Sequence, residues 1–72
     1  KNGEIIICDY KTDRISQSEQ DDPELLISNM REKHGKQLKE YKFAVEQIFS
    51  KPPQKIYIYS IPLGRLLEID GI

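Results

Sequence analysis

Apolar residues occur in separate blocks along the chain, and the spacing within each block indicates one kind of secondary structure. The run Ile-Ile-Ile-Cys at positions 5–8 predicts a strand over residues 4–10. Four consecutive apolar residues favour a strand covered on both faces, so Cys8 is expected to be buried as a small apolar side chain. Near the other end of the chain, alternating residues predict strands over 55–60 and 66–70.

A signal for the start of a helix lies between the first two predicted strands. Asp22 can cap free backbone amides, and the proline and glutamate that follow suit the first helical turn. This start predicts a helix over residues 23–31, and Gly35 is expected to end or bend it. Residues 16–22 are polar and without periodicity, which is typical of a mobile loop.

The longest element expected is a helix over residues 36–50. Its apolar residues recur at three- and four-residue steps, namely Leu38, Tyr41, Val45 and Ile48. The pair Pro52-Pro53 ends it, because proline cannot donate to the helix ladder and disfavours a helical residue before it.

The order of these elements predicts an α/β fold. A strand, a helical crossover and a second strand give a parallel pair, and a turn at residues 62–65 adds an antiparallel third strand. Asn2-Gly3 is typical of a hairpin turn, yet one residue precedes it. We therefore expect a partner strand outside this chain, and an exposed sheet edge through which the chain can dimerise.

Composition limits the chain to one small domain of 72 residues with a single cysteine, which excludes an internal disulfide. No apolar stretch is long enough for a membrane span and no secretory signal is visible, so a cytoplasmic protein is expected. Residues 31–55 carry a net charge of +4 with histidine neutral. Lys36 and Lys39 form a basic stripe there, which suits either phosphate contacts or a solvated helix face.

Asp9 and Lys11 emerge together from the end of the first strand. Side chains two residues apart on a strand point to the same face, so the two can share one cavity. A carboxylate there can hold magnesium, and an ammonium beside it can address the attacking water. The same pair is also common as a solvated surface ion pair.

A wider pattern surrounds this pair. Residues 3–13 read Gly-Glu-Ile-Ile-Ile-Cys-Asp-Tyr-Lys-Thr-Asp, and a helix then carries Gln37-Leu38, Tyr41 and Ala44-Val45. Over nearly its whole length the chain resembles the C-terminal nuclease domain of the AddA and RecB helicase-nucleases, most of all AddA, in the PD-(D/E)XK superfamily.

The resemblance implies a partial restriction-endonuclease-like fold, with residues 1–72 as the C-terminal part of one nuclease domain. The earlier part of that domain and the helicase motor with its ATP site would lie outside the chain. The implied activity is magnesium-dependent exonuclease action on double-strand breaks in recombinational repair, beside a second, AddB-like subunit. Because further metal ligands would precede residue 1, the fragment is expected to bind magnesium weakly and to be inactive.

The resemblance also assigns site residues. Asp9 matches the metal-binding carboxylate and Lys11 the catalytic lysine, and the Tyr10 carbonyl is a further candidate ligand. Gln37 matches the helical glutamine that reaches the active centre, where it can orient a ligand, a water or the DNA backbone. Tyr41 lies one turn further along the same helix face and is expected to pack over the site.

Other polar residues near this pattern have less specific roles. Lys36 and Lys39 are candidate DNA contacts. Thr12 and Asp13 each suit either a DNA contact or a hydrogen bond that anchors the turn. His34 is expected at the surface or the helix end, with a phosphate contact or a position flanking the site as the alternatives.

Three alternatives remain open from the sequence. A CRISPR-associated or AddB-like nuclease would carry an iron–sulphur cluster, which the single cysteine disfavours. A catalytically idle nuclease fold would bind or assemble with a partner protein. In the third alternative, a small α/β interaction domain would use the basic stripe and tyrosines for contacts that do not depend on Lys11.

Overall fold

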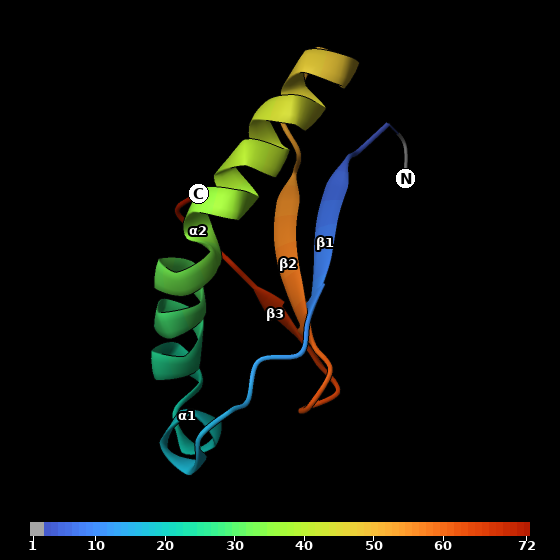
Figure 1. Cartoon of the computed structure of the whole chain (residues 1–72). Coiled ribbons are helices and arrows are strands. Elements are labelled where there is room, and N and C mark those ends of the chain that lie inside the picture. The colour runs from blue at the N-terminus through green and yellow to red at the C-terminus, as the bar shows by residue number, and fades with distance from the viewer. Residues whose placement is uncertain (1–2) are drawn as a thin grey trace.

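The computed structural model describes residues 3–72. It contains a three-stranded sheet with one long helix across one of its faces (Figure 1). The strands are β1 (Ile6–Lys11), β2 (Lys55–Ser60) and β3 (Arg65–Glu68), in the order β1-β2-β3. β1 and β2 are parallel, and β2 and β3 are antiparallel. The predicted α/β class and mixed sheet are confirmed.

The strand boundaries differ from those predicted because pairing decides where each strand begins. β1 starts at Ile6, not at residue 4, since Ile6 is the register partner of Lys55, the first residue of β2. β3 starts one residue earlier than predicted and ends at Glu68, although the Ile69 amide still donates to the Ile56 carbonyl at 2.9 Å.

One continuous helix, α2 (Pro23–Phe49), replaces the two helices that the sequence predicts. Asp22 caps it as expected, with its side chain accepting a hydrogen bond from the Leu25 amide at 3.2 Å. The helix does not end at Gly35, and it changes direction near its middle, in keeping with the predicted bend (Figure 1). A Cβ placed at Gly35 would lie 3.5 Å from Ile72 Cδ1, so the chain terminus packs beside the middle of α2 (Figure 1). A single glycine costs a helix about 1 kcal/mol, which a 27-residue helix packed on a sheet can absorb.

The segment predicted as a mobile loop instead contains a short helix, α1 (Gln17–Asp21). Ser16 is its N-cap and forms a capping box with Glu19, whose amide donates to Ser16 Oγ and whose carboxylate accepts from the Ser16 amide. Glu19 Oε2 also accepts from Asn29 Nδ2 at 2.9 Å, which ties α1 to α2. The Ser-x-x-Glu spacing is a local signal that the sequence does carry.

The core lies between α2 and the sheet. Its buried apolar residues are Leu26, Met30 and Leu38 from α2, Ile56 and Ile58 from β2, Leu67 from β3, and Ile69. Tyr41 and Ile48, predicted to belong to the apolar face, are 41% and 73% exposed. A six-residue strand spans roughly 20 Å, whereas a 27-residue helix spans roughly 40 Å, so the last turns of α2 continue beyond the strands (Figure 1).

The opposite face of the sheet is open within residues 3–72. Ile6 and Tyr10 are 52% and 66% exposed, and Cys8 between them is exposed as well. The predictions of a strand covered on both faces and of a buried Cys8 are therefore wrong for the described residues, because α2 packs on one face alone. Tyr10 packs against Tyr59 on this open face, with ring centroids 5.4 Å apart.

β1 lies at an edge of the described sheet, so pairing of two copies through that edge stays a prediction. Asn2 of the expected hairpin turn lies outside the described residues. No helix within residues 3–72 has the length and apolar character needed to cross a membrane.

Candidate active site

The three residues predicted to be catalytic converge on one point between β1 and α2. Lys11 Nζ donates a 2.6 Å hydrogen bond to Gln37 Oε1 and lies 3.0 Å from Asp9 Oδ2. Asp9 and Lys11 share the covered face of β1, and their side chains are 19% and 17% exposed. Gln37 reaches them from the adjacent face of α2, across 26 positions of sequence.

One oxygen of Asp9 has a charged neighbour but accepts no hydrogen bond. Its Oδ2 is buried and accepts no hydrogen bond, because the contact with Lys11 Nζ has the distance of an ion pair without hydrogen-bond alignment. The Lys11 ammonium compensates the charge of this oxygen, and its lone pairs remain available to a further partner such as a metal ion. The oxygen therefore has the chemistry of a cation ligand.

The described residues do not complete a magnesium site around that oxygen. Magnesium prefers six oxygen ligands, and Asp9 with the Tyr10 carbonyl would supply few of them. No group of three or more His, Cys, Asp or Glu side chains within residues 3–72 could hold a metal ion. A metal at Asp9 would need oxygens from other parts of the protein, from substrate or from water.

A second polar cluster lies just beyond the end of β1. Asp13 Oδ2 accepts from Lys33 Nζ at 2.7 Å and contacts His34 Nε2 at 3.0 Å. The hydrogen bond from Lys33 holds the pKa of Asp13 below its ordinary value; partial burial opposes this, and His34 reinforces it. The same hydrogen bond raises the pKa of Lys33.

His34 is thus not the surface residue that the sequence predicts. Its side chain is 14% exposed, and Asp13, which it contacts, is 13% exposed. The sequence did carry a signal that Asp13 lies on the same side as Asp9 and Lys11, because the three residues alternate along the chain. The partner on α2 could not be identified without the tertiary structure.

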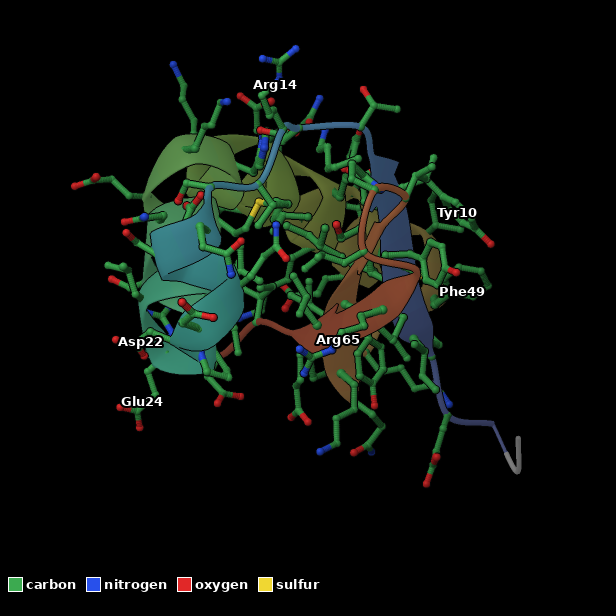
Figure 2. The ribbon with its side chains drawn as sticks, turned by 90° about the horizontal axis from the view of Figure 1, so that it is seen from below. Tyr10, Arg14, Asp22, Glu24, Phe49 and Arg65 are labelled. Atoms are coloured by element: carbon green, nitrogen blue, oxygen red, sulfur yellow. The ribbon has the colours of Figure 1, made fainter. Side chains whose placement is uncertain are left out.

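The supporting residues lie further from this centre. The Tyr10 side chain points away from α2 (Figure 2), so its backbone carbonyl is the group on which its proposed ligand role depends. Tyr41 is too exposed to be a core residue. Thr12, Lys36 and Lys39 are exposed, as candidate DNA contacts must be.

Similarity to a known protein supports one part of this interpretation. The chain is 30% identical over 64 residues to one of the subunits of an ATP-dependent helicase/nuclease from Natranaerobius thermophilus. The match covers 89% of this chain, which spans about 5% of the length of that relative. No protein-family model and no solved structure matches the chain. The chain is therefore similar to a short segment of a helicase/nuclease subunit.

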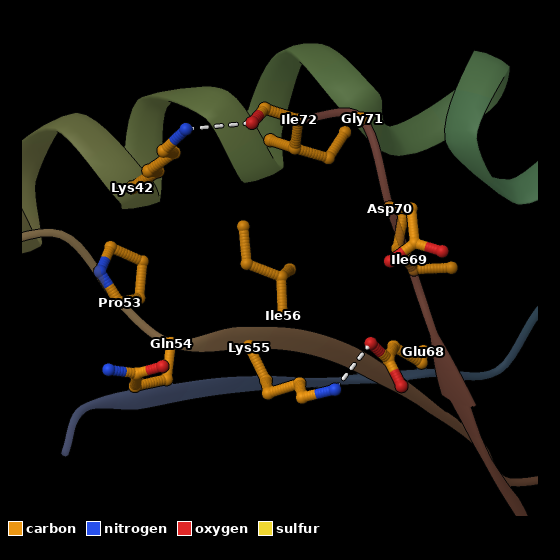
Figure 3. A pocket seen from close by; sticks show the side chains of 10 residues that line it. All are labelled: Lys42, Pro53, Gln54, Lys55, Ile56, Glu68, Ile69, Asp70, Gly71 and Ile72. Carbon is orange, nitrogen blue, oxygen red and sulfur yellow. Dashed lines mark hydrogen bonds and ion pairs between the residues drawn. The ribbon is translucent and has the colours of Figure 1, made fainter.

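A separate hollow of about 210 Å³ opens between α2, the start of β2 and the C-terminal segment (Figure 3). Its lysines already have partners, since Lys42 Nζ donates to the Ile72 carbonyl at 2.7 Å and Lys55 pairs with Glu68 at 2.9 Å. Lys55 starts β2 beside Ile6, whereas Asp9 and Lys11 lie at the other end of that strand pair. The hollow is therefore distinct from the Asp9 and Lys11 site.

Proposed function

We propose that this chain supplies Asp9 and Lys11 to a magnesium-dependent deoxyribonuclease site in an AddA-like helicase-nuclease that processes broken DNA ends. The observation that carries the proposal is the convergence of Asp9, Lys11 and Gln37, which are the residues that the resemblance assigns to catalysis. The likeness to a helicase/nuclease subunit supports the wider setting.

Each of the three residues has a distinct role in phosphodiester hydrolysis. The Asp9 carboxylate, whose Oδ2 lies beside the Lys11 ammonium at 3.0 Å, would be a ligand for the cation. When bound, magnesium would polarise the phosphate and activate a water. The Lys11 ammonium stabilises negative charge that develops on the phosphate oxygens. Gln37, by accepting a hydrogen bond from Lys11, orients that ammonium.

The proposed substrate is DNA, and the proposed partner is a second, AddB-like subunit. The relative is itself named as one subunit, which is in keeping with such an assembly. Lys36 and Lys39 are exposed on α2, the helix that carries Gln37, and could meet DNA phosphates. Their contribution would weaken as salt concentration rises.

The test is made in the complete protein that carries this chain. Asp9→Ala and Lys11→Ala should each lower magnesium-dependent DNA cutting by about 100-fold or more, as the loss of one charge-stabilising group typically does. ATP-dependent unwinding should remain. Lys55→Ala is the matched control, because Lys55 also forms an ion pair on this sheet but lies at its other end. Normal cutting by the Asp9→Ala protein would refute the assignment.

An idle nuclease fold that binds a partner is the second candidate, and the open sheet face with its Tyr10–Tyr59 pair favours it. Exposed aromatic side chains are enriched where proteins associate. In that case Lys11→Ala would leave every activity of the complete protein unchanged, so the same experiment separates the two functions.

A further inference from the structure

The polar contacts between β1 and α2 form a series that continues past the end of the strand. Asp9, Lys11 and Asp13 lie on the covered side. Thr12 between them and Arg14 after them are exposed, and Arg14 points outward in Figure 2. Two of the α2 side chains that meet this series are three residues apart, Gln37 opposite Lys11 and His34 opposite Asp13. Residues three apart on a helix share one face.

The two contacts differ in how well they can define a distance. Lys11 and Gln37 have long side chains that each lose conformational freedom when their hydrogen bond forms, so this bond forms only where the backbone spacing is already set. Asp13 and His34 are short, with two side-chain torsions each, and both are at most 14% exposed to solvent. Their 3.0 Å contact therefore fixes the spacing more closely.

Lys33, the other partner of Asp13, cannot define the spacing in the same way. Its side chain is 67% exposed and flexible, so its ion pair with Asp13 is screened by water. His34 lies on the sheltered side of the same carboxylate.

From these contacts we infer that Asp13 and His34 are positioning residues, whose contact holds the end of β1 at the distance from α2 at which Lys11 meets Gln37. The expected effect on catalysis rests on the proposed function, whereas the expected effect on the Lys11–Gln37 contact does not. When the contact is lost, the Lys11 ammonium spends less time beside Gln37. A displacement of about 1 Å in such a group can cost up to about 100-fold in rate.

The fold itself does not depend on this contact. The core residues Leu26, Leu38 and Ile58 are at most 1% exposed and hold α2 on the sheet by apolar packing. Removal of the His34 side chain should therefore leave the fold and disturb the local spacing.

Three variants separate positioning from a general structural role. His34→Leu removes the contact, whereas His34→Gln keeps an N–H donor near the position of Nε2. Lys33→Ala is the matched control, because it removes the exposed partner of Asp13 and keeps the buried one.

The first readout is an NMR experiment on the 72-residue chain. Cross-relaxation between the side chains of Lys11 and Gln37 should be lost in His34→Leu and kept in His34→Gln and Lys33→Ala. The second readout is DNA cutting by the complete protein. There His34→Leu should lower kcat by about 10- to 100-fold without changing KM for DNA, and His34→Gln should restore most of it.

Retention of the Lys11–Gln37 cross-relaxation in His34→Leu would overturn the inference, as would an equal loss in His34→Gln. If His34→Leu does not fold, Asp13→Ala removes the same contact from the other side and carries the same expectations. If the wild-type complete protein does not cut DNA at all, the proposed function fails, and the NMR readout still decides the positioning role.

Discussion

Gly35 in the middle of α2 offers a sharp test of the helix as one continuous element. Replacing it with alanine should stabilise the chain by about 1 kcal/mol, which is the difference in helix propensity between the two residues. Part of this gain comes from the unfolded state, because alanine has less backbone freedom to lose. No steric penalty offsets it, since the new Cβ would meet Ile72 Cδ1 at 3.5 Å, an ordinary contact distance.

Urea unfolding of the chain, followed by far-ultraviolet circular dichroism, measures this gain. With a slope of about 1 kcal/mol per molar urea for a chain of this size, the midpoint should rise by about 1 M in Gly35→Ala. The thermal midpoint should rise by roughly 4–8 °C.

Gly64→Ala is the control with the opposite sign. Gly64 has a φ of +63° in the turn between β2 and β3, and a Cβ there would approach only the Tyr59 hydroxyl, at 3.8 Å. Any loss must therefore come from the left-handed backbone, which costs an alanine roughly 1–2 kcal/mol. A lower urea midpoint for Gly35→Ala would refute the reasoning, because it would mean that the helix breaks at Gly35.

Two further predictions concern the core and the Asp13 cluster. Leu38 is fully buried, so Leu38→Ala should cost about 2–5 kcal/mol and remove most of the cooperative unfolding transition, whereas Phe43→Ala, at a residue 63% exposed on the same helix, should be close to neutral. Equal urea midpoints for these two variants would contradict the assigned core. Because Lys33 and His34 lower the pKa of Asp13 in the folded state, Asp13 stabilises the fold above the ordinary aspartate pKa, and this contribution is lost as pH falls toward the lowered value. In Asp13→Asn the free energy of unfolding, measured by urea titration, should therefore fall less between about pH 5 and pH 2 than in the unsubstituted chain. An equal fall in both proteins would rule this linkage out.

The sequence predicted the contacts among Asp9, Lys11 and Gln37 more fully than it predicted the helices. Asp9 and Lys11 share a face because strand residues alternate, and the resemblance placed Gln37 at the same centre. The contact between Asp13 and His34 was missed, since nothing local indicates which helix residue lies opposite a loop carboxylate. The short helix α1 was missed although its signal, Ser16 with Glu19, is local and was present in the sequence.

Local periodicity in the sequence determined the strands, the parallel pairing of β1 with β2 and the side of β1 on which Asp9 and Lys11 lie, because these properties follow from backbone geometry and chain order. The tertiary structure alone decided that α2 continues through Gly35, that the face carrying Cys8 and Tyr10 stays open in the described residues, and that His34 meets Asp13. Each of these depends on which surfaces pack together. Packing is a property of residues distant in sequence, so no local pattern contains it.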